Sequence, residues 1–218
     1  MSERKATVWR VVLYLFGMVV LALGLTLNTE AGLGSSAIIS VPYTISQGTG
    51  ISLANLTLVL YCLFVAAQFV IKGKNRKLTD ALQIVLSIVF TRFMALFKMA
   101  LGYQSGNFGM DLVTLIAGLV LTGVGAALTV DMRLVPNPGD GIVSCIADRA
   151  GKELGFTKNC VDLCSVGISL ILGCLFGSPL LGIGLGTVLS MIGVGRVIAV
   201  FNHFAKEPLQ KMAGLSGN

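Results

Sequence analysis

Six long apolar stretches constrain the fold of this 218-residue chain more than any other feature. Each is long enough to cross the hydrocarbon core of a bilayer as a helix, which takes about 17–25 residues. Because only 12% of the residues are charged, the chain cannot cover the surface of a soluble domain of this size. The sequence therefore predicts an all-α integral membrane protein. The six predicted transmembrane helices cover 9–27, 53–71, 81–101, 112–130, 160–176 and 180–201.

The basic residues predict the orientation of these spans. With six spans and a cytoplasmic N-terminus, thirteen of the sixteen Lys and Arg residues fall on the cytoplasmic side, and the predicted outer loops contain none. This asymmetry follows the positive-inside rule, so both termini are expected in the cytoplasm. The net charge of +6 is then a topology signal, and no nucleic-acid partner is expected. The thirteen residues are Arg4, Lys5, Arg10, Lys72, Lys74, Arg76, Lys77, Arg133, Arg149, Lys152, Lys158, Lys206 and Lys211.

Two further apolar segments, 36–47 and 139–150, are too short to cross the membrane. Both begin with residues that favour a helix start: a Gly-Ser-Ser sequence at 34–36 and Asn137 as a candidate N-cap. If the first segment crossed the membrane, the basic run at 72–77 would face outside, against the charge rule. We therefore expect two short half-helices that are either re-entrant or interfacial.

The chain repeats itself at a spacing of about 103 to 105 residues. Each half contains three spans and one half-helix, which closes on Gly48 in the first half and on Gly151 in the second. Because three is an odd number, the second half enters the membrane from the opposite side. The sequence thus predicts two inverted-topology repeats, 1–104 and 105–218, within one membrane domain. The matching segments are 25–27 with 128–130, 50–52 with 155–157, and 92–97 with 196–201.

Inverted repeats with re-entrant helices are typical of alternating-access carriers. The N-terminal ends of the two half-helices would meet near the middle of the membrane, where free N–H groups and the positive ends of the helix dipoles suit an anion. This predicts a small-molecule transporter for an anionic or zwitterionic solute. The alternative is a scaffold or accessory protein of a biosynthetic or regulatory system, whose half-helix ends would be packed shut on apolar side chains.

Arg92 and Arg196 occupy equivalent positions inside spans of the two halves. An arginine at membrane depth costs at least about 2.5–3.5 kcal/mol, so it normally faces a cavity or a partner. Either the two arginines together grip an anionic solute, or each pairs with a local acid or with backbone carbonyls. The sequence leaves both interpretations open.

Three further side chains are candidates for binding. Asp140, in the first turn of the second half-helix, either stabilises the helix start or binds a proton or cation. Asp162 begins the fifth predicted span, and its simplest alternative role is to pair with Arg196 or Arg92. Tyr43 lies beside a proline in the first half-helix and either lines a site or follows a kink. The full set of predicted solute-binding residues is Arg92, Arg196, Gly34, Ser35, Ser36, Tyr43, Asn137, Gly139, Asp140 and Asp162.

The sequence offers little for catalysis or metal binding. Its five cysteines form no Cys-x-x-Cys pair and it has a single histidine, so neither a metal site nor a cofactor is expected. No nucleophile–base pair or phosphate-binding loop is visible, so we do not expect an enzyme. Glycines on the sixth span permit a homodimer in the bilayer without requiring one.

Short motifs gather at the half-helices and span ends, at 32–36, 41–46, 49–52, 135–141, 161–162 and 184–187. In these motifs, and over nearly its whole length, the chain resembles the YczE/YyaS/YitT-like family of bacterial integral membrane proteins. The family motif Pro-Gly-Glu-Gly reads Pro138-Gly139-Asp140-Gly141 here, which keeps the acid. The resemblance implies a location in the bacterial cytoplasmic membrane and does not name a substrate.

Overall fold

The computed structural model describes residues 3–75, 78–103 and 106–215; Arg76 and Lys77, two of the thirteen predicted cytoplasmic residues, lie outside the described residues. Within the described part, the protein is all-helical, with eight α-helices, two short 3-10 helices and no strand. The α-helices are α1 (Glu3–Glu30), α2 (Ala37–Thr49), α3 (Leu53–Lys72), α4 (Leu82–Leu101), α5 (Phe108–Asp131), α6 (Pro138–Ala150), α7 (Leu154–Leu175) and α8 (Leu185–Met212).

Six helices, α1, α3, α4, α5, α7 and α8, are long and apolar enough to cross a membrane. The chain is therefore a multi-pass membrane protein, as the apolar stretches predict. The two short segments are also helical, and they form α2 and α6, of 13 residues each. Left-handed glycines end both: Gly151, with a φ of 61°, ends α6 as predicted, whereas Gly50, with a φ of 74°, ends α2. The predicted end at Gly48 is wrong, because Gly48 still lies within α2.

The predicted start of the fifth span, at 160, is wrong. α7 begins at Leu154, because Glu153 adopts the extended N-cap conformation and its carbonyl accepts the N–H of Thr157 at 3.0 Å. The polar residues before 160 thus belong to the helix, although they interrupt the apolar stretch. As a consequence, Asp162 lies about two turns inside α7 and not at its beginning.

The predicted start of the sixth span, at 180, is also wrong. α8 begins at Leu185, because two glycines interrupt the helix before it: Gly182 has a φ of 81° and Gly184 is extended. The resulting loop packs against α2, where a Cβ on Gly182 would lie 2.7 Å from Oγ1 of Thr44.

α1 and α5 form a closely packed antiparallel pair. A Cβ on Gly24 of α1 would lie 2.4 Å from the backbone N of Thr122, and a Cβ on Gly125 of α5 would lie 2.4 Å from the backbone N of Leu21. Glycines at these crossings let the two backbones approach each other more closely than larger residues would.

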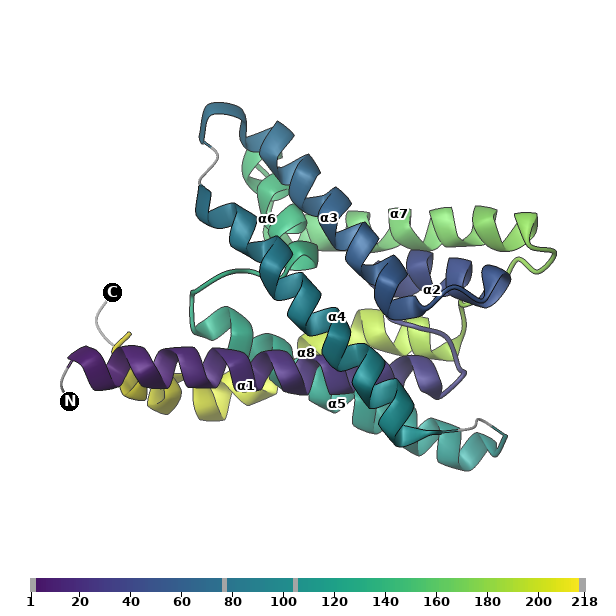
Figure 1. Cartoon of the computed structure of the whole chain (residues 1–218), viewed down its shortest axis with the longest axis horizontal. Helices are drawn as coiled ribbons and strands as arrows, with labels where there is room; N and C mark the ends of the chain where they lie inside the picture. The colour runs from purple at the N-terminus through teal and green to yellow at the C-terminus, as the bar shows by residue number, and fades with distance from the viewer. Residues whose placement is uncertain (1–2, 76–77, 104–105, 216–218) are drawn as a thin grey trace.

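The pair lies in the lower part of the view in Figure 1, and α2, α3, α6 and α7 lie above it. α4 packs against α1 and α8 against α5, while α2 packs against α7 and α6 against α3. α3 also packs against α4, whereas no comparable contact joins α7 to α8, both of which are described throughout. The start of α1 and the end of α8 lie at the same end of the molecule (Figure 1).

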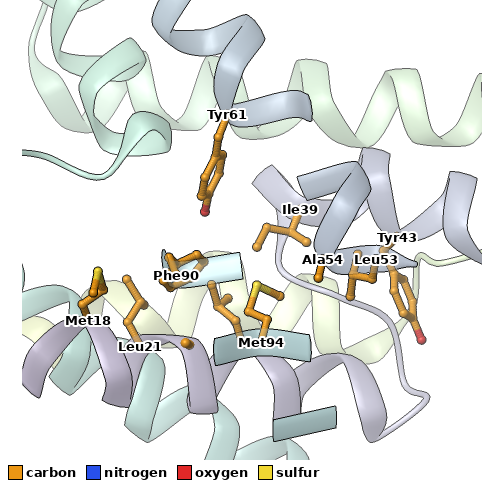
Figure 2. Packing of buried hydrophobic residues seen from close by; sticks show 11 residues of the cluster. Met18, Leu21, Ile39, Tyr43, Leu53, Ala54, Tyr61, Phe90 and Met94 are labelled. Atoms are coloured by element: carbon orange, nitrogen blue, oxygen red, sulfur yellow. The ribbon is translucent and has the colours of Figure 1, made fainter. Parts of the chain in front are cut away.

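Apolar side chains fill the space where α1, α2, α3 and α4 converge. Figure 2 shows Leu21 of α1, Ile39 of α2, Tyr61 of α3, and Phe90 and Met94 of α4 within one buried cluster. The rings of Tyr61 and Phe90 are 5.9 Å apart between centroids. This cluster seals the contact between α3 and α4.

Candidate functional site

A cavity of about 280 Å³ lies where the N-terminal ends of α2 and α6 meet. Apolar side chains of α1, α5 and α8 form much of its wall, and a few polar groups face it from several helices. Such a mixture is typical of sites that bind small molecules. The polar residues in its lining are Ser36, Tyr61, Thr122, Asn137, Asp140, Lys158, Asn159, Asp162 and Ser190.

The two helix ends touch each other, and they differ in how their N–H groups are satisfied. A Cβ on Gly139 of α6 would lie 2.9 Å from Cδ1 of Ile38 of α2, so the glycine permits the approach. In α6, Oδ1 of Asn137 accepts the N–H of Gly139 at 3.0 Å. In α2, the N-cap residue Ser36 makes no capping bond, and its buried hydroxyl has no partner among the described residues. The start of α2 therefore keeps free hydrogen-bonding capacity.

Three charged side chains lie in the lining of the cavity. Asp140 is in the first turn of α6, where the helix dipole favours a carboxylate. Asp162 of α7 is only 4% exposed, and its Oδ2 is 3.2 Å from Nζ of Lys158, one turn earlier. The predicted pairing of Asp162 with Arg196 or Arg92 is therefore wrong.

The described residues of the cavity lining contain no group of side chains suited to hold a metal ion. Among residues 3–75, 78–103 and 106–215, no three of His, Cys, Asp and Glu lie close enough together to hold a metal ion.

Neither of the two predicted arginines lines the cavity. Arg92 is exposed on α4, a helix that contributes nothing to the lining, and its Nη2 donates to Oδ1 of Asn55 on α3 at 2.6 Å. Arg196 is exposed on α8 beside Gly195, which does line the cavity. Successive residues of a helix point about 100° apart, so position 196 lies off the face that the cavity uses. The joint grip of both arginines on one solute is thus not formed in this structure.

Gly34, Ser35 and Tyr43 also lie outside the lining, although the sequence predicts them as binding residues. Gly34 has a φ of 103° and packs closely on the backbone at the start of α8. The N–H of Ser35 donates to the carbonyl of Gly182 at 3.3 Å. The hydroxyl of Tyr43 donates to the carbonyl of Thr29 at 2.9 Å. These three residues hold α2 against α1 and the loop before α8.

The remaining predicted residues, Ser36, Asn137, Gly139, Asp140 and Asp162, do come together around the cavity. Lys158 also lines the cavity, although the sequence pattern assigns it only to membrane topology. Its spacing of four residues from Asp162 was the available signal, because residues four apart are neighbours on a helix.

A second missed feature is a pair of buried amides that holds the start of α6. Nε2 of Gln68 donates to Oε1 of Gln83 at 3.2 Å, and Nε2 of Gln83 donates to Oε1 of Gln68 at 3.1 Å. Gln68 also donates to the carbonyl of Pro138 at 3.3 Å. Both side chains are buried, on α3 and α4 respectively. Two glutamines inside otherwise apolar spans were the signal in the sequence.

Comparisons with known proteins identify similar membrane proteins. The profile of a family of unknown function, DUF6198, matches residues 8–203. The chain is 26% identical over 196 residues to the uncharacterized membrane protein YczE of Bacillus subtilis, and the alignment covers 89% of this chain and 86% of that protein. It is 30% identical over 198 residues to an uncharacterized protein of Haemophilus influenzae, with 89% and 84% covered. It is 22% identical over 188 residues to the uncharacterized protein YyaS of Bacillus subtilis, with 86% and 90% covered. No solved structure is significantly similar to the chain.

Proposed function

Because this chain belongs to the DUF6198 family of YczE- and YyaS-like bacterial membrane proteins, whose function is unknown, we propose a function from the geometry of its cavity. The protein is a small-molecule carrier that works by alternating access and binds a zwitterionic solute. The observation that carries the proposal is that the N-terminal ends of α2 and α6 reach one cavity, which also holds Asp140, Lys158 and Asp162.

The helix contacts support an arrangement of two inverted repeats, α1–α4 and α5–α8. In this arrangement each helix has a counterpart four helices later in the chain. The contact of α2 with α7 then corresponds to the contact of α6 with α3, and the contact of α1 with α4 corresponds to that of α5 with α8. Each of the first two contacts contains a bond between its helices: Oγ of Ser40 is 2.7 Å from Oγ of Ser169, and Sγ of Cys145 is 3.9 Å from the carbonyl oxygen of Gln68. In this arrangement α2 and α6 are re-entrant helices that enter from opposite faces, a construction found in carriers.

The solute class follows from the difference between the two helix ends. The start of α2 offers the unpartnered hydroxyl of Ser36 and uncapped N–H groups, which suit a carboxylate. The start of α6 is already capped by Asn137 and carries Asp140, which suits an ammonium group. A small zwitterion satisfies both ends at once, whereas a simple anion would meet the carboxylate of Asp140.

The proposal places both termini in the cytoplasm, in the bacterial cytoplasmic membrane, because this orientation puts most basic residues inside. α7 then begins on the cytoplasmic side, and the cavity extends toward that side past Gly155 and Lys158. We assign this structure to the state of the carrier that is open to the cytoplasm. Labelling of a cysteine introduced at Lys74 from outside intact cells would contradict this orientation.

A thermal-shift screen of the purified full-length protein tests the solute class. The probes are L-alanine and glycine betaine as zwitterions, lactate as an anion and ethylammonium as a cation. We expect a zwitterion to raise the melting temperature, and Asp140→Asn to remove the rise. Asp148→Asn is the matched control, because Asp148 is on the same helix, is exposed and does not line the cavity.

Transport itself is tested by uptake of the stabilising zwitterion into proteoliposomes. We expect uptake that depends on Asp140 and survives Asp148→Asn. A lactate or ethylammonium shift as large as the zwitterion shift would contradict the solute class, and binding without any uptake would contradict the carrier.

A further inference from the structure

We infer that two equivalent Arg–Asn pairs, Arg92–Asn55 and Arg196–Asn159, are latches that alternately close the two sides of the carrier. A latch here means a hydrogen bond that joins the two outer helices of one repeat, α3 with α4 or α7 with α8. In this structure the first latch is closed and the second is open. The inference rests on the proposed alternating-access function and assigns to the arginines a role outside the cavity.

The sequence positions of the two pairs match. Asn55 and Arg92 are 37 residues apart in the chain, and the same separation divides Asn159 from Arg196. Each member of the second pair lies 104 residues after its counterpart, which is the spacing of the internal repeat. In two inverted repeats, residues related by this spacing occupy corresponding places on opposite sides of the membrane.

The first pair is bonded. Nη2 of Arg92 donates to Oδ1 of Asn55 at 2.6 Å, across the contact between α3 and α4. A hydrogen bond from a charged donor is stronger than one between neutral groups, and an arginine within a span needs such a partner. The bond lies beside the apolar cluster in which Tyr61 packs against Phe90. It therefore holds together the helices that close this side.

The second pair lies at the open side. Asn159 is in the lining of the cavity, and Arg196 is exposed on α8 outside the lining, as Arg92 is exposed on α4. α7 and α8 make no contact comparable to that of α3 with α4. Movement of α7 against α8 would close the cavity and bring Asn159 to Arg196. The opposite state then forms one latch as it breaks the other, which keeps the two states close in free energy.

Cysteine accessibility tests the latches without any solute. In the full-length protein with its five cysteines replaced, one cysteine is introduced at Met191, which lines the cavity on α8. In a second variant it is introduced at Ser87, the buried counterpart 104 residues earlier on α4. With the native latch we expect fast maleimide labelling at 191 and slow labelling at 87.

Arg92→Met should raise the rate at 87 by about tenfold and lower the rate at 191, because it removes a charge-assisted bond from only one state. Asn55→Leu should have the same effect, and the double variant should add nothing further. Arg196→Met is the matched control and should leave the rate at 87 unchanged or lower. Unchanged rates in Arg92→Met would overturn the latch, as would a rise at both sites.

The two proposals fail separately in this experiment. If labelling shifts as expected but no variant takes up a zwitterion, the result supports the latch and contradicts the carrier. If the native protein takes up solute but Arg92→Met does not shift the labelling, the result supports the carrier and contradicts the latch.

Discussion

The contact between α3 and α4 and the gap between α7 and α8 are built from equivalent parts of the chain, but only the first is filled. Residues 104 positions apart show the difference: the filled contact has apolar residues throughout and a phenylalanine, where the gap has a lysine and a smaller valine. The equivalent residues are Ala54 and Lys158, Phe90 and Val194, and Met94 and Ile198. Phe90 and Met94 are buried in the cluster of Figure 2, whereas Lys158, Val194 and Ile198 line the cavity.

If the protein is the proposed carrier, its preference for one open side resides in a few side chains and not in the fold. Phe90 fills the space between its helices, while a valine at 194 and a charged residue at 158 leave theirs unfilled. Close packing is lost where Val194 stands in place of a phenylalanine, so in the proposed carrier this is the side that opens. Exchanging or removing these residues tests whether they set the difference between the two sides.

The largest effect is expected from filling the cavity with the side chains of the closed side. Val194→Phe combined with Ile198→Met should lower the labelling rate of a cysteine at 191 by about tenfold or more, equivalent to at least about 1.4 kcal/mol. The same variant should lose any solute-induced rise in melting temperature. Val188→Phe is the control, since Val188 is exposed on the same helix and outside the lining. Unchanged access at 191 would show that volume does not set the difference.

The next effect is on stability. Phe90→Ala should lower the free energy of unfolding by about 2 kcal/mol or more, because it leaves a cavity around a side chain that is 2% exposed. Val194→Ala should cost less than about 1 kcal/mol, since Val194 already borders empty space. Unfolding in mixed detergent micelles measures both. Equal losses would mean that the two sides are packed alike.

A smaller loss is expected at the amide pair. Gln68→Leu should cost about 1–2 kcal/mol, because it leaves buried polar groups of Gln83 and Pro138 without a partner. Gln68→Leu with Gln83→Leu should cost less than the single variant, because both partners of the reciprocal pair are then apolar. Unfolding of both variants in the same micelles provides the comparison. A double variant that is less stable than the single one would contradict this.

The smallest effect is expected at the ion pair that joins α1 to α4. Nζ of Lys98 is 2.9 Å from Oε1 of Glu30, and the lysine side chain is largely exposed. Lys98→Met should change the free energy of unfolding by less than about 0.5 kcal/mol, because exposed pairs contribute little. A large loss, or a shift in cysteine labelling at 87, would mean that this pair also holds the closed side.

The sequence was sufficient to predict the six spans and both short helices, because apolar length and helix-start residues are local signals. It was not sufficient for the starts of α7 and α8. Polar residues continue a helix at 154–159 once Glu153 caps it, and glycines interrupt an apolar stretch at 182–184. Hydropathy does not report either effect.

About half of the predicted site residues line the cavity. Most of the residues that do so belong to a locally predictable helix end, whereas the position of the others depends on tertiary packing. Asn137, Gly139 and Asp140 belong to a helix end, so one local prediction carries all of them. Arg92 and Arg196 are charged residues within predicted spans, but the helix face on which they lie depends on tertiary packing. The reciprocal pairing of Gln68 with Gln83 likewise joins two helices, and no local pattern reveals it.

The amide pair of Gln68 and Gln83 determines how the start of α6 responds to acid. Neither Gln68 nor Gln83 gains or loses a proton at any physiological pH. The support under the first turn of α6 is therefore neutral, while the carboxylates of Asp140 and Asp162 face the cavity above it. Acidification can change the charge that a solute meets without loosening the helix that presents it.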